Sequence, residues 1–533
     1  MGLATPAVEA VATPADATRV ARTAVAGGAA IVGAVAAVKL ALHLATASVY
    51  GFFIDELYFL ACGEHLAWGY VDFPPLTAFQ AWLARHLFGD SPWSIRLLPA
   101  LAGAATVLLT GALARRLGGG RFAQGLAAIC VLVAPVFLAF SSYLSMNPVE
   151  PMIWTGCCLL LVRMIDTGDT RLWLPFGLLA GVGVLNKHTM LVFALAVVVG
   201  LLLSKERRLL RSRWLLAGGA LALLVVLPHA VWEVRHGFPH FEVLANIRRD
   251  GRDVPVGFLQ FWAMELLFLN PAAAPVWVTG LLALFAARRL QRVRALGWAF
   301  LVVLACLFLT TPGSHKTYYA AAAYPMLIAA GATVVEEAIG AGRRRWLGPA
   351  YAALLLVTGA VLAPAITPVL PPDVYLRYTR AIGIAQPRLE NRATSAMPQL
   401  FADRFGWPEM VATVARVYHS LPPEQRARTG LFANDFGQGG AIDFYGPSYG
   451  LPKAIGGHLT YWYWGPRDYT GESLIVLGDR REVLEREFED VRALATVGHP
   501  YAMRQEHFTV FLCQRPRGGW TLGSVWPRLK TWR

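Results

Sequence analysis

Four carboxylates lie in one short stretch of the sequence, FIDELYFLACGEHLAWGYVDFPPLTA, namely Asp55, Glu56, Glu64 and Asp72. The stretch directly follows a long apolar run, so a membrane helix is expected to end just before Asp55 and Glu56. The aromatic and aliphatic residues that come next predict a short helix at the membrane surface, which would bury part of the surroundings of this acidic pair. A carboxylate at such a depth can keep enough basicity to accept a proton.

Cationic residues occupy other predicted helix ends on the same side of the membrane. They are Lys187 and His188 in NKH, His315 and Lys316 in PGSHKTYY, and Arg248, Arg249 and Arg252 in a loop at 233–257. Each cation alone could be an anchor whose stem lies along the membrane surface. Together they predict an anion site that faces a carboxylate, which is the arrangement needed to bind a lipid phosphate and to activate a nucleophile beside it.

The composition indicates which elements position these residues. Of the 533 residues, 56% are hydrophobic and 15% are charged, and the mean hydropathy is +0.46. A soluble domain has roughly 25% charged residues, so we predict an α-helical polytopic membrane protein. Apolar runs of spanning length predict about eleven transmembrane helices, centred on residues 26–48, 94–114, 122–142, 151–165, 172–186, 189–204, 214–232, 272–287, 295–311, 318–338 and 347–368.

Loops rich in Arg and Lys follow every second apolar run, so all of these loops lie on one side of the membrane. The positive-inside rule places that side in the cytoplasm. The N-terminus is then cytoplasmic, and everything after about residue 370 lies outside. The net charge of +14 is spread over these loops rather than gathered into one patch, so no nucleic-acid partner is expected. In one alternative topology, the run around LNKHTM is a single long tilted helix, which would invert all later segments.

The long apolar runs end near residue 369, which divides the chain into two predicted domains. Residues 1–369 form a transmembrane domain with a first outer loop at 51–92, and residues 370–533 form an extracytoplasmic soluble α/β domain. In the second domain TGLFAND, ESLIVLGD and FTVFLCQ read as strands, and REVLEREFEDVRALA (481–495) reads as a helix.

The stretch from Asp55 to Ala78 resembles the first outer loop of bacterial glycosyltransferases akin to protein O-mannosyltransferases and the lipid A aminoarabinose transferase, in the GT-C superfamily. The shared features are an acidic DE pair, an aromatic-rich helix, GY and a D-x-P-P-L turn. SMNPVEPMIW, LNKHTM and HKTYYAAAAYP resemble further segments at helix ends. FANDFGQGGAIDFYGPSYGLP and YWYWGP resemble the outer C-terminal domain of one bacterial branch.

The resemblance implies a GT-C-like fold and an inverting transferase in the bacterial inner membrane, which moves a sugar from a polyprenyl-phosphate donor to an extracytoplasmic lipid, glycan or protein. Asp55 matches the catalytic acidic position and Glu56 is its usual neighbour. The second acidic position falls on Glu150, with Asn147 as the alternative. The residues expected to bind the donor phosphate are Lys187, His188, His315, Lys316 and Tyr319, and those expected to bind substrate are Tyr58, Tyr70, Asp72 and Asn147.

The chemistry of these residue types agrees with that expectation. A phosphate leaves readily once its charge is neutralised, which suits Lys187, Lys316 and His315, whereas the acceptor needs a base, which suits Asp55. No residue spacing makes a metal compelling, although Asp55 with Glu150 could hold a divalent ion. The competing class is a polytopic transporter or a flippase for a lipid-linked saccharide, in which charged residues within the membrane would line a path.

Overall fold

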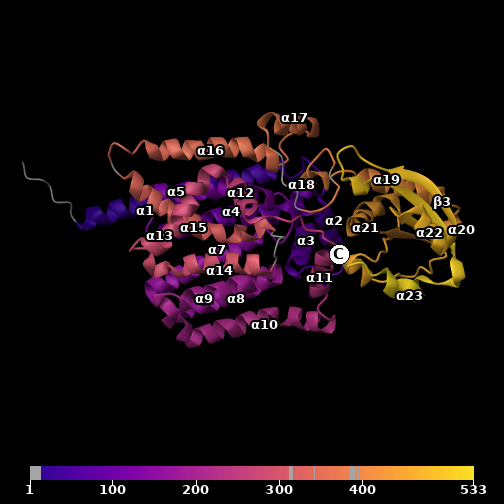
Figure 1. Cartoon of the computed structure of the whole chain (residues 1–533), viewed down its shortest axis with the longest axis horizontal. Helices are drawn as coiled ribbons and strands as arrows, with labels where there is room; N and C mark the ends of the chain where they lie inside the picture. Colours follow the sequence, from indigo (N-terminus) through magenta and orange to yellow (C-terminus); the bar gives the residue numbers. More distant parts are fainter. Residues whose placement is uncertain (1–13, 311–315, 341, 385–389, 394, 533) are drawn as a thin grey trace, which may run out of the picture.

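The computed structural model describes residues 14–310, 316–340, 342–384, 390–393 and 395–532. Figure 1 shows an elongated molecule, with a bundle of long helices at one end and a mixed α/β region at the other. Helices α2 (Ile54–Glu64), α3 (Leu76–Phe88) and α11 (Pro239–Arg249) lie between the two ends. These three helices belong to the segments expected outside the membrane.

Each of the predicted spanning runs contains a helix. Five described helices are long and apolar enough to cross a membrane, or up to six if α12 (Phe258–Phe268) and the helical segment after it, bent by 94°, count as one span. The chain is therefore a helical, multi-pass membrane protein. The helices of the bundle are α1 (Pro14–Thr46), α4 (Pro92–Arg116), α5 (Arg121–Val133), α6 (Pro135–Phe140), α7 (Val149–Thr167), α8 (Trp173–Asn186), α9 (Thr189–Leu202), α10 (Arg213–Arg235), α12, α13 (Ala274–Ala286), α14 (Ala295–Thr310), α15 (Tyr324–Ile339) and α16 (Leu347–Ile366).

Helices α8 and α9 form a hairpin rather than one continuous helix. Lys187 follows α8 in an extended conformation, with φ −160° and ψ 134°, which ends the helical hydrogen bonding. The indole Nε1 of Trp173, at the start of α8, donates to the carbonyl of Leu209, just beyond α9, at 3.2 Å. The two ends of the hairpin that lie away from Lys187 are therefore adjacent, and the alternative of one long tilted helix is wrong.

The basic loops meet at the opposite end of the bundle from Lys187. Arg289 donates to the carbonyl of Leu117 at 2.9 Å and pairs with Glu337 at 2.6 Å. Arg292, in the same loop, pairs with Asp166 at the end of α7. Loops that the sequence places on one side of the membrane are therefore neighbours in space.

The C-terminal region contains a four-stranded sheet in the order β1-β2-β4-β3. β1 (Thr429–Ala433) is parallel to β2 (Ser473–Leu477), and β4 (Phe508–Pro516) is antiparallel to both β2 and β3 (Phe488–Val497). The three predicted strands are confirmed. Its helices are α17 (Pro372–Ile382), α18 (Gln399–Ala402), α19 (Trp407–Ser420), α20 (Pro423–Ala427), α21 (Phe436–Tyr445), α22 (Arg481–Glu487) and α23 (Leu522–Val525).

The helix predicted over residues 481–495 is wrong in its second half. α22 ends at Glu487, and the chain continues as β3 because this segment pairs with β4 along the edge of the sheet. Phe488 and Val491 are buried there. The helix-like charge pattern of the segment is overridden by the burial of these two side chains against the sheet.

The first outer loop and the C-terminal region share one hydrophobic core. Leu57 and Phe59 of α2 belong to the same buried cluster as Trp407, Phe436 and Ile475. Helices α2 and α21 approach so closely that a Cβ added at Gly440 would lie 2.6 Å from the backbone carbon of Leu57, which only glycine avoids. The loop is therefore held in place by residues some 400 positions further along the chain.

Candidate active site

Asp55 is the second residue of α2, at the end of the helix where backbone N–H groups point outward. Among the residues that the structure describes, none forms a hydrogen bond or an ion pair with the carboxylate of Asp55. Burial raises the pKa of its carboxyl to about 7; the charges of Glu390 and Asp72 also raise it, and Arg252 and Arg392 oppose the shift. A carboxylate with a pKa near neutrality, and with no other partner, is suited to accept a proton from a substrate.

An ion cluster beside Asp55 contains two arginines and a lysine, paired with carboxylates. Glu390 accepts from Arg252 at 2.8 Å and from Arg392 at 3.0 Å, and Lys316 pairs with Asp253 at 3.3 Å. Burial disfavours the charged form of Lys316, but Tyr319, Asp253 and Glu390 outweigh it and raise its pKa, so this lysine stays charged. Arg252, Arg392 and Lys316 therefore supply cationic donors near Asp55 that can contact an anion.

A second polar cluster surrounds Lys187. Its Nζ lies 2.9 Å from Glu150 Oε2 and 3.1 Å from Asn147 Oδ1, and the ammonium is 4.5 Å from the ring centroid of Tyr319. Thr189 donates a further hydrogen bond to Glu150. The charge of Glu150 is therefore already balanced by Lys187, which weakens the case for an ion shared between Asp55 and Glu150.

Two tyrosines connect these clusters to Asp55. Burial raises the pKa of Tyr143 to about 12, with the charge of Asp55 adding to the shift, whereas the side chains of Asn147 and Ser145 oppose it. Tyr319 contacts Lys187 through its ring and interacts electrostatically with Lys316. The fold thus brings six predicted site residues into one region: Asp55, Asn147, Glu150, Lys187, Lys316 and Tyr319.

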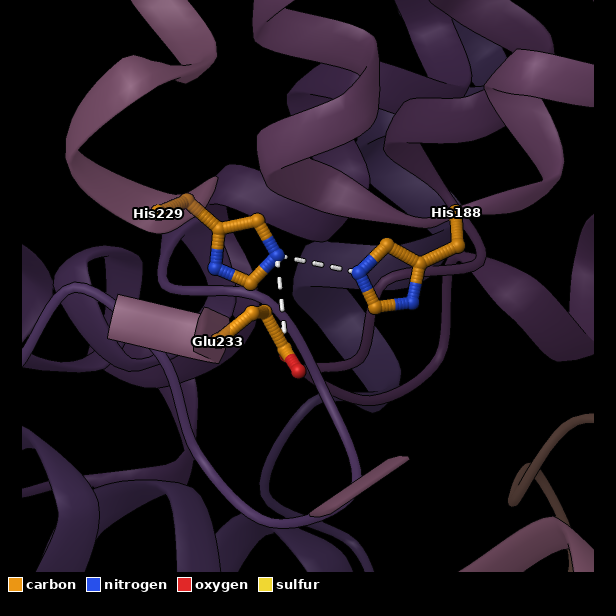
Figure 2. Close-up of side chains that lie close together, drawn as sticks. All are labelled: His188, His229 and Glu233. Atoms are coloured by element: carbon orange, nitrogen blue, oxygen red, sulfur yellow. Dashed lines mark hydrogen bonds and ion pairs between the residues drawn. The ribbon is translucent and has the colours of Figure 1, made fainter. Parts of the chain in front are cut away.

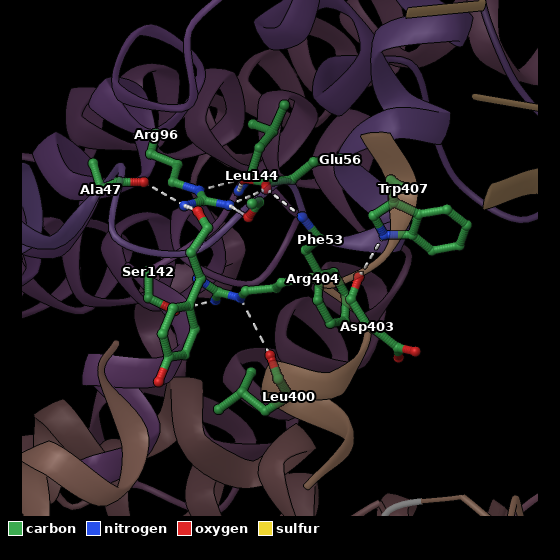
Figure 3. A network of polar contacts seen from close by, with 12 residues as sticks. Ala47, Phe53, Glu56, Arg96, Ser142, Leu144, Leu400, Asp403, Arg404 and Trp407 are labelled. Carbon is green, nitrogen blue, oxygen red and sulfur yellow. Dashed lines mark hydrogen bonds and ion pairs between the residues drawn. The ribbon is translucent and has the colours of Figure 1, made fainter. Parts of the chain in front are cut away.

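Glu56 has a different environment from its neighbour Asp55. It is fully buried and paired with Arg96, at 2.6 Å and 3.0 Å, and it accepts from the backbone N–H groups of Phe53 and Leu144, each at 2.8 Å. Burial alone would raise the pKa of Glu56, but Arg96 lowers it. Figure 3 shows this pair where the first two outer segments meet, so Glu56 fixes the start of α2 rather than facing a substrate.

The C-terminal region adds contacts at the same place that the sequence did not indicate. The backbone N–H of Ile54 donates to the carbonyl of Asp403 at 3.0 Å. Arg404 Nη2 donates to Ser142 Oγ at 3.0 Å, as Figure 3 shows. Residues 403 and 404 therefore hold both the start of α2 and the segment after α6. No local motif could have revealed them, nor Glu390 and Arg392.

The remaining predicted residues lie in several places. The hydroxyl of Tyr58 is 3.0 Å from Asp72 Oδ1 and 2.6 Å from Thr460 Oγ1, and Tyr70 donates to the Cys62 carbonyl at 3.0 Å. Both tyrosines are buried and support the first outer loop. Burial also raises the pKa of the Asp72 carboxyl, to about 6.

Two predicted donor-binding residues do not join these contacts. The imidazole of His188 faces His229 at 3.0 Å instead of Lys187. His315 lies outside the described residues. The sequence analysis also missed His229 and Glu233, although their spacing of four residues on a helix was a usable signal.

Residues 72–232 match the family model described as dolichyl-phosphate-mannose-protein mannosyltransferase. The fold resembles solved structures of ArnT from Cupriavidus metallidurans in the apo state, with a TM-score of 0.58 and 16% identity over 90% of this chain and 97% of that one. ArnT bound to undecaprenyl phosphate gives a TM-score of 0.56 and 15% identity over the same shares of the two chains. The arabinofuranosyltransferase AftD from Mycobacteria gives a TM-score of 0.51 and 13% identity over 91% of this chain and 40% of that one.

No curated protein sequence matches the chain. The family match over residues 72–232 and the fold together indicate the class of the protein, a membrane glycosyltransferase that uses a lipid-phosphate sugar donor. The transporter alternative is therefore set aside.

Proposed function

We propose that this enzyme moves a sugar from a polyprenyl-phosphate donor to an extracytoplasmic lipid, glycan or protein acceptor, with inversion at the sugar carbon. The observation that carries the proposal is Asp55, a carboxyl without a hydrogen-bond partner among the described residues, whose pKa is raised to about 7 and which lies near Arg252 and Arg392. The structure of ArnT with undecaprenyl phosphate supports a carrier lipid of the polyprenyl type.

In this proposal Asp55 takes the proton from the acceptor as it attacks the sugar. The donor phosphate leaves from the opposite face through an oxocarbenium-like state. Arg252, Arg392 and Lys316 neutralise the negative charge that grows on the phosphate, and Lys187 with Tyr319 borders the same space. No step requires a metal, because the leaving group is already acidic.

We further propose that the chain crosses the bacterial inner membrane about eleven times, with its N-terminus in the cytoplasm and residues 370–533 outside. The clustering of the basic loops at one end of the bundle supports this orientation. A polyprenyl-phosphate sugar presented outside the membrane would then reach Asp55 directly.

Asp55→Asn tests the proposed base. The change removes basicity but little volume, so we expect sugar transfer to fall by at least about 100-fold while binding of the lipid donor is retained. The matched control is Asp90→Asn in the same outer loop, where the carboxylate is exposed and pairs with Arg85. Turnover by the Asp55 variant at the control's level, on a polyprenyl-phosphate sugar, would remove Asp55 from the mechanism.

A further inference from the structure

A separate group of potential metal ligands lies at the end of α10 that contacts the C-terminal region. His229 and Glu233 are four residues apart on α10, and His188 comes from the break between α8 and α9. Figure 2 shows the two imidazoles and the carboxylate pointing toward one another. The Nε2 atoms of the two histidines are 3.0 Å apart, His229 Nε2 is 3.9 Å from Glu233 Oε1, and one ligand atom from each residue lies within 4.8 Å of the others.

The protonation of His229 is set by its second nitrogen. Nδ1 lies 2.7 Å from the carbonyl oxygen of Trp68, which can only accept, so Nδ1 carries the hydrogen. In a neutral imidazole the lone pair is then on Nε2, which faces His188 and Glu233. A histidine oriented by a backbone carbonyl in this way is the usual second-shell arrangement around a bound metal.

Glu233 distinguishes a metal site from a simple histidine pair. One imidazole could donate to the other without any ion, but this would leave the carboxylate unsatisfied. Glu233 is only 7% exposed, and its Oε1 is buried without a hydrogen-bond partner among the described residues. A buried carboxylate of this kind is costly unless a cation or a donor compensates it.

We propose that His188, His229 and Glu233 bind one divalent transition-metal ion, with Zn²⁺ the best match to two imidazoles and a carboxylate. Ligand nitrogens around tetrahedral zinc are about 3.3 Å apart, given Zn–N bonds of about 2.0 Å to 2.1 Å, so the observed 3.0 Å requires only a small side-chain adjustment. The nearest further imidazole is His240, whose ring centroid is 4.7 Å from that of His188 and whose Nδ1 is also buried without a hydrogen-bond partner.

The ion would act as a structural link. It would join α10 to His188, which directly follows Lys187. Through the hydrogen bond of His229 to the Trp68 carbonyl, it would also join α10 to the first outer loop. Two of these segments carry groups of the proposed site, because His188 directly follows Lys187 and Asp55 belongs to the first outer loop. The inference goes beyond the proposed transfer reaction, because none of these ligands is needed to move a proton or to stabilise the leaving phosphate.

The test uses the full-length protein in detergent, purified without a histidine tag and treated with a chelator. Zn²⁺ is titrated in and bound metal is counted by elemental analysis, and Co²⁺ is added separately because its visible absorption reports nitrogen and oxygen ligation. We expect about one ion per chain, and at least tenfold weaker binding in His188→Ala, His229→Ala and Glu233→Gln. The control is His236→Ala, an exposed histidine directly after α10, which should bind like the unmodified protein.

Thermal unfolding with and without Zn²⁺ separates a lost site from a lost fold. The ion should raise the Tm of the unmodified protein and of His236→Ala but not of Glu233→Gln, which retains the shape of the side chain. The proposal is overturned if the unmodified protein binds no stoichiometric metal, or if the ligand variants bind it as tightly as His236→Ala does. Because no substrate is present, either failure leaves the role of Asp55 untouched.

Discussion

At Asp55, the balance between burial and neighbouring charge sets the pH at which the base can work. Its pKa is raised to about 7, and only the deprotonated carboxylate can accept the proton of the acceptor. We therefore predict that kcat/KM rises about tenfold per pH unit below about pH 7 and levels off above it. A pH–rate profile with a soluble acceptor analogue measures this, and a profile that stays flat from about pH 5.5 to about pH 8.5 would contradict the assignment.

One variant alone cannot separate a structural role of Lys187 from its proposed role in donor binding. Lys187→Met should destabilise the protein by about 3–5 kcal/mol, because Glu150 would remain buried and charged without its partner. Adding Glu150→Gln should restore much of the unfolding temperature.

Donor binding should respond differently in the same pair of variants. If Lys187 contacts the donor phosphate, its loss should weaken affinity by about 1.5–3 kcal/mol in the single and the double variant alike. Thermal unfolding and a lipid-phosphate binding assay are measured together. Unchanged affinity in the stable double variant would reduce Lys187 to a structural residue.

On the scale of one element, α2 is held at its start by a buried ion pair and at its end by exposed ones. Glu56→Gln would leave the Arg96 charge buried without a counter-ion, so we expect a loss of about 3–5 kcal/mol in stability. Glu64→Gln is the matched control at the other end of the helix. Its pairs with Arg85 and Lys453 are partly exposed, and their loss should cost no more than about 1 kcal/mol.

The measurement is chemical unfolding of the purified variants, monitored by tryptophan fluorescence. Equal losses for Glu56→Gln and Glu64→Gln would show that the burial of the Arg96 pair does not stabilise the start of α2. The same comparison applies to transfer, since a displaced α2 would move Asp55. Activity should therefore fall in Glu56→Gln and persist in Glu64→Gln.

On the scale of the whole molecule, the first outer loop and the C-terminal region must lie on the same side of the membrane, because they share one core. An alkaline phosphatase fused to the C-terminus of the full chain should be enzymatically active, since that reporter works only outside the cytoplasm. A fluorescent reporter that matures in the cytoplasm should be dark when exported at the same position. The opposite pair of results would invert the topology and move Asp55 to the cytoplasmic side.

The sequence by itself determined the features that depend on neighbouring residues. Each predicted spanning run contains a helix, because a long run of apolar residues in lipid must satisfy its backbone hydrogen bonds internally. Three of the four strands and the acidic pair at the start of α2 could be predicted in the same local way. The break at Lys187 was visible too, although only the structure showed that it turns the chain back.

Tertiary structure decided which of these residues act together. Asp55 and Glu56 are adjacent in sequence, but successive side chains on a helix point about 100° apart. Asp55 therefore lies near Arg252 and Arg392, whereas Glu56 is buried against Arg96. Glu390 and Arg392 lie more than 330 residues from Asp55, and His188 lies some 40 residues from His229, so no spacing rule could connect them. Charge and metal chemistry depend on distances of a few ångströms, and in this chain those distances are set by packing between segments remote in sequence.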